Sequence, residues 1–219
     1  MSCKLITIQG NIGSGKSTIV KKLQDRYGEN KRICFLQEPV DIWNNIKDEN
    51  GKTILSLFYE NQKEYSFSFQ MMAYISRLQI LKKAVDEGYD YIVSERSLDT
   101  DKNIFAKMLY DDKNIKYVEY QIYLKWFEEF QPLFQEEHVV YVRTEPEIAY
   151  KRVNKRAREG ENIPIEYLEN CHRYHEEWLM TDDSYKSHLL LIDGNQDIEE
   201  NPEVMENWLL EIYDYIINN

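Results

Sequence analysis

Cysteine is scarce in this sequence, and its spacing excludes two kinds of scaffold. Cys3, Cys34 and Cys171 lie far apart and form no C-x-x-C pair. Structural zinc sites and small secreted domains need closely spaced or numerous cysteines. We therefore expect free thiols, two of them buried in strand-like surroundings, and a protein of a reducing compartment such as the cytoplasm.

Long apolar runs, low-complexity segments and Pro/Gly-rich linkers are also missing. No apolar stretch is long enough to cross a bilayer, and the N-terminus lacks the pattern of a signal peptide. The sequence thus predicts neither membrane contact nor a boundary between domains. Its 219 residues, 42% of them hydrophobic, suit a single domain over residues 1–219 with a substantial core.

Basic charge is in deficit as well. The 27 Lys and Arg residues are outnumbered by 39 Asp and Glu residues, which gives a formal net charge of −12. A polyanion is bound through a basic field, so this balance argues against a nucleic-acid polymer as the partner. It is compatible with a small substrate in a locally basic pocket.

Short apolar strands alternate with amphipathic helices along the whole chain. This alternation predicts an α/β fold, with a five-stranded, mainly parallel sheet covered by helices on both faces. In such sheets ligands bind beyond the carboxyl ends of the strands. The expected strands are 4–9, 33–37, 90–94, 138–143 and 188–192. The expected helices are 16–27, 65–87, 116–134, 145–159, 164–178 and 203–217.

The first strand runs directly into a complete G-x-x-x-x-G-K-[ST] motif, followed by a helix. Glycines in such a loop let the backbone N–H groups approach phosphates at the helix N-terminus. Lys16 is placed for the β- and γ-phosphates and Ser17 for Mg²⁺, so the first ligand is a nucleoside triphosphate such as ATP. The nucleotide-binding residues expected here are Gly10, Asn11, Ile12, Gly13, Ser14, Gly15, Lys16, Ser17 and Thr18.

Charged side chains follow the second and third strands. Glu38 precedes Pro39, which ends the strand, and its carboxylate can accept a proton from an attacking hydroxyl. Glu95 can hold Mg²⁺ as Walker-B carboxylates do, and Arg96 can bind the acceptor or the developing charge. The alternative is a structural ion pair between the two. Trp43 is either a core residue or a stacking platform for a base.

Between these strands, Gln70, Ala73, Tyr74 and Arg77 share one face of the expected helix. A Gln side chain can pair with an amide-like base edge, but the same face could also be a partly exposed polar stripe on a packed helix.

After the fourth strand, five basic residues fall within residues 151–158. They could form a nucleic-acid patch, a solvated helix face, or a lid that closes over transferring phosphates. Arg152 and Arg156 are four residues apart and face one side, which suits a clamp. Gly160 and Pro164 bracket the next loop and make a hinge plausible.

Taken together, the sequence resembles the deoxyribonucleoside kinase family of deoxycytidine, deoxyguanosine, mitochondrial thymidine and insect multisubstrate kinases. The resemblance extends from the phosphate loop to about Leu179 and includes several motifs in the family's order. These are GNIGSGKST, Glu38-Pro39-Val40 with Trp43, Phe67-Ser68-Phe69-Gln70, Glu95-Arg96-Ser97, the segment from Arg152 to Arg158, and the segment from Ile163 to Leu168. It implies a P-loop kinase fold with an Arg-rich lid, and a homodimer built on long helices.

The resemblance also implies roles for individual residues. Glu38 takes the proton of the 5′-hydroxyl, and Arg96 orients that hydroxyl. Arg152, Arg156 and Arg158 form the lid. Tyr59 holds the sugar 3′-hydroxyl together with Glu159 or Glu161; the spacing favours Glu161. The base contacts are Gln70, Trp43 and Phe105.

Base choice depends on Arg77 and Asp101, which lie near Gln70 and Ala73 in this pattern. Deoxycytidine and deoxyguanosine kinases resemble this chain in having Arg and Asp there, whereas thymidine-accepting members have uncharged residues. An Arg–Asp pair fills the space that a thymine methyl group needs, and Asp101 can accept from an exocyclic amino group. The sequence therefore predicts deoxycytidine or a purine deoxynucleoside as the substrate, in preference to thymidine.

Two other function classes stay open on the sequence. A nucleoside monophosphate kinase of the thymidylate type shares the loop and the lid, although Glu38 would repel an acceptor phosphate. A non-catalytic nucleotide-binding module fits less well, because it has no use for Glu38, Glu95 and Arg96 together.

Overall fold

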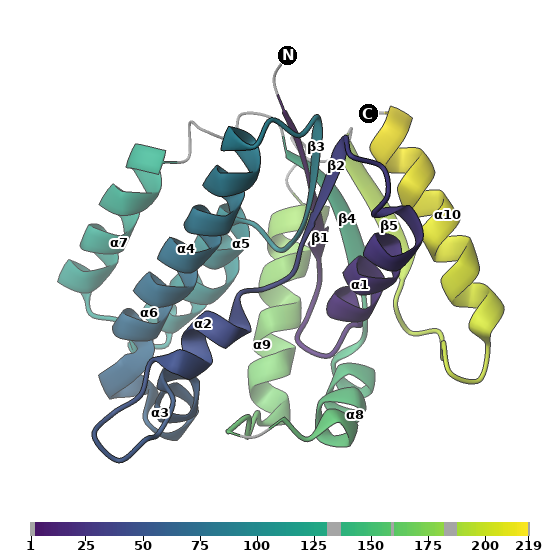
Figure 1. Cartoon of the computed structure of the whole chain (residues 1–219). Helices are drawn as coiled ribbons and strands as arrows, with labels where there is room; N and C mark the ends of the chain where they lie inside the picture. Colours follow the sequence, from purple (N-terminus) through teal and green to yellow (C-terminus); the bar gives the residue numbers. More distant parts are fainter. Residues whose placement is uncertain (1–2, 131–136, 159, 182–187, 219) are drawn as a thin grey trace.

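A five-stranded parallel sheet forms the centre of the computed structural model, which describes residues 3–130, 137–158, 160–181 and 188–218. The strand order is β2-β3-β1-β4-β5, and every neighbouring pair is parallel (Figure 1). The α/β fold expected from the sequence is therefore confirmed. The strands are β1 (Lys4–Gln9), β2 (Ile33–Leu36), β3 (Tyr91–Glu95), β4 (Glu137–Arg143) and β5 (Leu189–Asp193).

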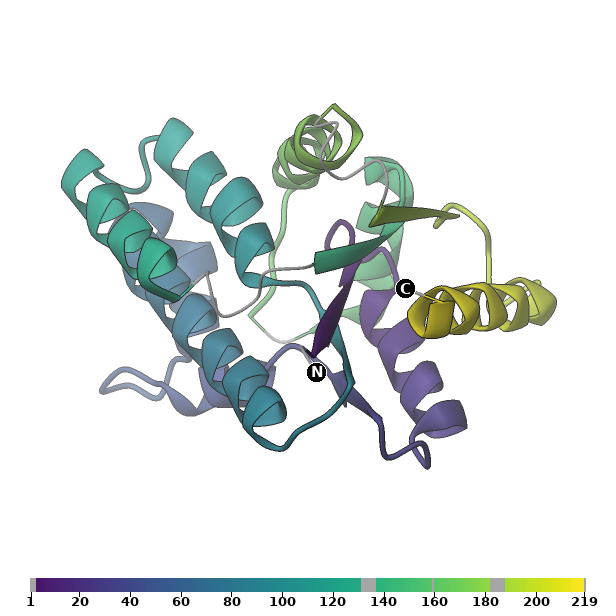
Figure 2. The same cartoon turned by 90° about the horizontal axis from the view of Figure 1, so that it is seen from above.

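Helices cover both faces of the sheet (Figures 1 and 2). The longer ones are α1 (Lys16–Tyr27), α4 (Gln62–Asp86), α7 (Tyr117–Phe130), α8 (Pro146–Arg156), α9 (Ile165–His175) and α10 (Pro202–Asn218). The shorter ones are α2 (Val40–Asn45), α3 (Ile54–Glu60), α5 (Leu98–Thr100) and α6 (Lys107–Asp111), with π-helical segments η1 (Asp101–Ala106) and η3 (Glu176–Met180).

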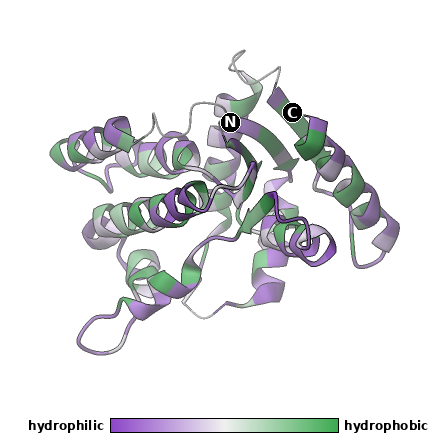
Figure 3. Ribbon diagram, turned by 45° about the horizontal axis from the view of Figure 1, so that its top comes forward, coloured by the Kyte–Doolittle hydropathy of each residue, from purple (hydrophilic) through white to green (hydrophobic). Residues whose placement is uncertain are grey.

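Side-chain alternation in the central strand β1 divides the core into two layers. Ile6 and Ile8 are fully buried and pack with α1 and α10 on one face. Leu5 points to the opposite face, where it packs with α4 and α7. The strands are accordingly coloured mostly hydrophobic in Figure 3, while purple gathers on the helices and outer loops. Thr7 and Gln9 are polar exceptions that share the face of Leu5, and they are also fully buried.

Several boundaries differ from those expected. The third strand ends at Glu95, so this carboxylate belongs to the strand and does not follow it. The helix expected over 164–178 changes to a π-helix after His175. The sequence analysis missed the short helices α2, α3, α5 and α6, because segments of three to seven residues are too short to show a helical period. Of the expected helix ends, residues 131–134 and 159 lie outside the described residues.

The carboxyl ends of β1, β2 and β3 lead directly into the segments that carry Lys16, Glu38 and Arg96. Adjacent parallel strands thus bring together residues up to 80 positions apart in the chain. Among the described residues, no helix combines the length and the apolar character needed to cross a bilayer.

Candidate active site

A cleft of about 1070 Å³ opens at this edge of the sheet. Of the helix face expected to comprise Gln70, Ala73, Tyr74 and Arg77, three residues line the cleft. The exception is Tyr74, which faces away from the cleft and packs edge-on against Tyr123. Gly10 and Asn11 do not line the cleft either. The other site residues expected from the sequence do: Ile12, Gly13, Ser14, Gly15, Lys16, Ser17, Thr18, Glu38, Trp43, Tyr59, Gln70, Ala73, Arg77, Glu95, Arg96, Asp101, Phe105, Arg152, Arg156, Arg158 and Glu161.

Gly10 and Asn11 support the phosphate loop from behind. A Cβ on Gly10 would lie 2.6 Å from the backbone oxygen of Val142, so only glycine fits against β4. The Asn11 side chain donates to the backbone oxygen of Leu168 at 2.9 Å and accepts from Ile12 N–H at 2.8 Å. These contacts fix the loop to β4 and α9.

Lys16 lies inside this loop with its ammonium group almost out of contact with solvent. Its Nζ donates to the backbone oxygen of Asn11 at 2.7 Å. Burial, followed by the positive charge of Arg96, lowers the pKa of Lys16 to about 7. The ammonium therefore lacks sufficient compensating charge in this pocket, and an anion beside it would raise its pKa again.

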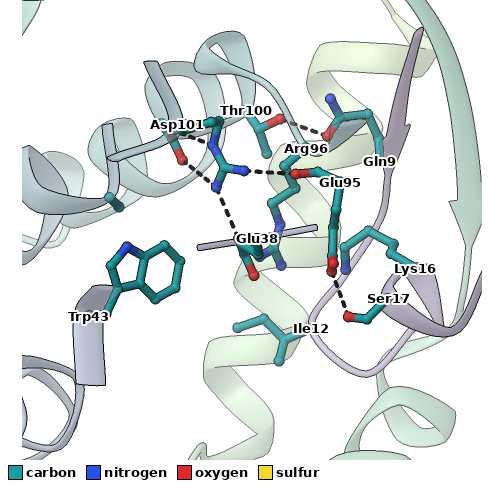
Figure 4. A network of polar contacts seen from close by, with 12 residues as sticks. Gln9, Ile12, Lys16, Ser17, Glu38, Trp43, Glu95, Arg96, Thr100 and Asp101 are labelled. Atoms are coloured by element: carbon teal, nitrogen blue, oxygen red, sulfur yellow. Dashed lines mark hydrogen bonds and ion pairs between the residues drawn. The ribbon is translucent and has the colours of Figure 1, made fainter. Parts of the chain in front are cut away.

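Two side chains with oxygen atoms that can bind a metal ion lie close together: Ser17 at the start of α1 and Glu95 at the end of β3. The Ser17 hydroxyl donates to Glu95 Oε1 at 2.8 Å (Figure 4). No cluster of three or more His, Cys, Asp or Glu side chains suited to a metal occurs in the described parts of the chain. One hydroxyl and one carboxylate fit Mg²⁺, because this ion keeps several waters and shares its coordination sphere with substrate phosphates.

Glu38 lies across the cleft from the phosphate loop and is surrounded by cations. Its Oε1 accepts hydrogen bonds from Arg96 Nη1 and from Arg77 Nη2, the latter at 3.0 Å. Burial alone would raise its pKa, but the charges of Arg96, Arg77 and Lys16 outweigh burial and lower the pKa to about 2. The carboxylate is therefore fully ionised at neutral pH and is a weak base.

Arg96 reaches Glu38 from an uncommon backbone conformation. Its φ is +64°, in the left-handed region that non-glycine residues rarely adopt. The guanidinium lies 4.9 Å above the ring of Phe105, and its Nε has no hydrogen-bond partner among the described residues. Strain of this kind persists where the surroundings fix the residue and is common at functional sites.

Arg77 and Asp101 form a buried ion pair behind Glu38. Arg77 is 1% exposed and donates from Nε to Asp101 Oδ2 at 2.9 Å and from Nη1 to the backbone oxygen of Glu95 at 2.7 Å. Asp101 begins the π-helical segment η1, and π-helices are rare structures that often occur at functional sites. The pair therefore connects α4, β3 and η1.

Aromatic rings form the inner wall of the cleft, beside Gln70. Trp43 donates its indole N–H to Ser76 at 2.9 Å and packs edge-on against Phe69 with ring centroids 5.4 Å apart. Trp43 is thus both a buried core residue and part of the cleft lining. Gln70 is buried, and its Oε1 has no partner among the described residues. A buried, unpaired carbonyl that lines a cleft favours a ligand with an N–H donor.

The basic segment after β4 covers the other side of the cleft. Arg152 donates to the backbone oxygens of Gly194 at 2.8 Å and Gln196 at 2.9 Å. Arg156 and Arg158 both form ion pairs with Glu161. Arg152 and Arg156 were expected to form one clamp, but in the structure their side chains bind different segments of the chain. Glu159 lies outside the described residues.

The sequence analysis missed one part of the cleft entirely. The last forty residues contain no recognisable motif, yet Asn195, Asp197, Ile198, Met205 and Trp208 line the cleft beside the phosphate loop. The loop after β5 and the start of α10 approach α8 only in the folded chain. No local pattern in the sequence could have indicated this.

Comparison with known proteins identifies the family. Residues 6–218 match the family described as deoxynucleoside kinase. A probable deoxycytidine kinase of Fowlpox virus (strain NVSL) is 34% identical to this chain, covering 97% of this chain and 88% of the relative. Deoxycytidine kinase 1 of Xenopus laevis is 32% identical, covering 97% and 90%, and deoxycytidine kinase of Homo sapiens is 31% identical, covering 91% and 87%.

The chain is therefore a P-loop phosphotransferase that belongs to the deoxynucleoside kinase family. This membership confirms the resemblance derived from the motifs and the kinase function expected from it. It favours a deoxynucleoside, and not a nucleoside monophosphate, as the phosphate acceptor.

Two glycines of the phosphate loop give a test of its geometry. Gly13 and Gly15 both have positive φ angles, +84° and +97°. A Cβ on Gly13 would also lie 2.5 Å from the backbone oxygen of Ala149 in α8, whereas a Cβ on Gly15 meets nothing within 4 Å. We expect Gly13→Ala to lower the free energy of unfolding by about 1–3 kcal/mol more than Gly15→Ala, because overpacking adds to the same backbone strain. Urea unfolding of both variants measures this difference, and equal midpoints would contradict it.

Proposed function

We propose that this chain, acting as one catalytic domain, transfers the γ-phosphoryl group of ATP or another nucleoside triphosphate to the 5′-hydroxyl of a deoxynucleoside. The observation that carries the proposal is the position of Glu38, an ionised carboxylate held by Arg96 and Arg77 across the cleft from Lys16. An acceptor hydroxyl placed at Glu38 faces the phosphate loop, as in-line phosphoryl transfer requires.

The donor phosphates occupy the loop between Gly13 and Thr18. Lys16 contributes its charge there, and phosphate binding keeps it protonated despite its lowered pKa. Ser17 and Glu95 hold Mg²⁺, which neutralises charge on the phosphate oxygens when bound. Arg156 and Arg158 can turn from Glu161 to the phosphates, because all three residues line the same cleft.

The acceptor hydroxyl is oriented by Glu38 and Arg96. Both hydrogen bonds that the described residues make to Glu38 end on Oε1, which leaves Oε2 for the hydroxyl. A carboxylate with a pKa of about 2 takes the proton late, after most of the phosphoryl transfer. This timing suits a loose transition state, in which positioning and charge stabilisation matter more than the strength of the base.

The nucleoside lies between the aromatic wall and the lid. Gln70 pairs with the base through its unpartnered carbonyl, with Trp43 and Phe105 on either side. The sugar 3′-hydroxyl is held by Tyr59 and Glu161. Burial first, and then the nearby charge of Glu161, raises the pKa of Tyr59, so this phenol stays protonated and available as a donor.

The experiment that tests this function is a panel of acceptors. Purified protein with ATP and Mg²⁺ is offered the four deoxynucleosides and, separately, their 5′-monophosphates. Phosphorylation of a deoxynucleoside that is abolished by Lys16→Ala supports the proposal. Turnover of the monophosphates alone, or unchanged turnover in Lys16→Ala, would contradict it.

Glu38→Gln isolates the role of the carboxylate. The variant keeps the shape of the side chain but cannot accept the proton, so we expect kcat to fall by about 10²–10⁴-fold while the KM for the nucleoside changes much less. Asp41→Asn removes a carboxylate from the same stretch and the same cleft, and serves as the matched control. A kcat in Glu38→Gln equal to that of Asp41→Asn, with chemistry rate-limiting, removes Glu38 from the mechanism.

Deoxycytidine or a purine deoxynucleoside is the substrate we expect, in preference to thymidine. Arg77 and Asp101 form a buried pair and line the cleft with Gln70 and Ala73. We infer that this pair occupies the space that a thymine methyl group would need. The double variant Arg77→Met with Asp101→Ala should raise the ratio of kcat/KM for thymidine to that for deoxycytidine. All turnover should fall as well, because Arg77 also binds Glu38. A wild type that prefers thymidine, or an unchanged ratio, would rule this out.

We also propose that the chain forms a homodimer through α7 and the adjoining part of α4. Val118, Ile122 and Trp126 lie four residues apart along one side of α7, and Val118 is 67% and Trp126 45% exposed. Ile75 of α4 is exposed as well. These two helices lie next to each other at one end of the molecule (Figures 1 and 2). An apolar stripe of this length on a helix favours burial against another copy.

Light scattering after size exclusion tests the dimer. We expect the wild type to have twice the mass of one chain. Ile122→Glu should have the mass of one chain, because a charge is not tolerated in an apolar contact. Leu210→Glu is the control, since Leu210 is similarly exposed on α10. A monomeric wild type would contradict the proposal, as would a dimer unaffected by Ile122→Glu.

A further inference from the structure

A second buried polar cluster lies against the face of the sheet that carries Leu5. Gln9 is at its centre: Nε2 lies 3.0 Å from Thr7 Oγ1, 3.2 Å from Ser97 Oγ and 3.2 Å from Glu137 Oε1. The Thr100 hydroxyl donates to Gln9 Oε1 at 2.7 Å (Figure 4). The cluster therefore links β1, the segment after β3, and the start of β4.

Such a cluster is costly unless every member is hydrogen-bonded. Thr7, Gln9 and Thr100 are fully buried in a layer where the sheet otherwise packs apolar side chains. A fully bonded buried network holds its parts in one relative geometry, because any shift leaves polar atoms unpaired. The function described above makes no use of this cluster.

The cluster is attached to the segment that carries Arg96. Ser97 N–H donates to Thr100 Oγ1 at 2.9 Å, and Thr100 N–H donates back to Ser97 Oγ, which closes a capping box at the start of α5. On the other side, Arg96 N–H donates to the backbone oxygen of Ile8 at 3.1 Å. Arg96 is thus anchored to β1 by its own backbone N–H and, through Ser97 and Thr100, by the side chain of Gln9.

A pair of carboxyl groups completes the cluster. Glu137 Oε1 accepts hydrogen bonds from Thr7 at 2.5 Å and from Gln9 at 3.2 Å, and the carboxyl group of Asp99 lies close enough to interact with it electrostatically. Burial, followed by the charge of Asp99, raises the pKa of Glu137 to about 8, and burial raises the pKa of Asp99. The other titratable groups that interact with Asp99 are Lys102 of η1, which lowers its pKa, and Tyr74 of α4.

We propose that Gln9 and Glu137 are positioning residues that, through Ser97 and Thr100, hold Arg96 in its left-handed conformation and so align it with Glu38. This inference rests on the proposed kinase function. When Glu137 is ionised beside Asp99, the two carboxylates repel each other, and the repulsion acts on the segment that contains Ser97 and Thr100. Turnover by the wild type should therefore decline as the pH rises above about 8.

The first test removes the hydrogen bonds while keeping the volume. Gln9→Met and Ser97→Ala should each lower kcat by about 10- to 100-fold with little change in nucleoside KM, because a small misalignment of Arg96 is costly. Ser94→Ala is the matched control: this serine is buried in β3, and its hydroxyl has no partner among the described residues. A kcat in Gln9→Met and Ser97→Ala equal to that of the control would overturn the proposal.

The second test removes the titration. In Glu137→Gln the amide oxygen can still accept from Thr7 and Gln9, but the side chain no longer titrates. With saturating substrates, kcat of the wild type should fall above pH 8, and kcat of Glu137→Gln should stay level to about pH 9.5. A level wild-type profile, or the same decline in both proteins, would overturn the proposal.

A third measurement does not depend on kinase activity. The measurement is hydrogen exchange of the backbone amides of Arg96, Ser97 and Thr100, with the β3 amide of Ser94 as the reference. Relative to Ser94, the protection of these amides should weaken from pH 7 to pH 9 in the wild type but not in Glu137→Gln. Absence of any deoxynucleoside phosphorylation would refute the proposed function, while this exchange would still decide the role of the cluster. Equal protection at both pH values would overturn the inference itself.

Discussion

The carboxylate of Glu38, held between the guanidinium groups of Arg96 and Arg77, is the interaction on which the rest of the site depends. These two cations, together with Lys16, lower its pKa to about 2 although burial acts in the opposite direction. Each cation must in turn be held in place, Arg77 by Asp101 and the backbone oxygen of Glu95, and Arg96 by a strained backbone. The ion network therefore ties the segment after β2 to β3, α4 and η1.

This arrangement divides the cleft into a rigid part and an adjustable part. On the rigid side, the charges are largely buried and bridged several times, so breaking one contact leaves an uncompensated charge. On the adjustable side, Arg156 and Arg158 pair with Glu161 at partly exposed positions, where an ion pair contributes little. A phosphate entering the cleft can therefore compete for the lid arginines without disturbing the acceptor side.

Many features of the fold and site were predictable from local patterns. The phosphate loop is recognisable because glycine spacing, Lys16 and Ser17 are contiguous, and their chemistry needs no distant partner. The alternation of apolar strands and amphipathic helices predicted the parallel sheet, and the rule that ligands bind at the carboxyl ends of parallel strands then predicted the location of the site. The short helices α2 and α3 escaped prediction because their helicity depends on packing around Trp43 and Phe58, not on periodicity.

The sequence by itself determined the family, the phosphate-binding loop and the residue types available for catalysis, because each of these is encoded in a contiguous motif. Only the tertiary structure decided which charges meet. Arg77 could have faced solvent, yet it joins Asp101 to Glu38. Gln9 looked like one more strand residue, yet its amide reaches Ser97, 88 positions away, and Thr100 reaches it in return. Such contacts depend on the register of β1 against β3 and β4, which is set by the packing of the whole sheet and not by any single segment.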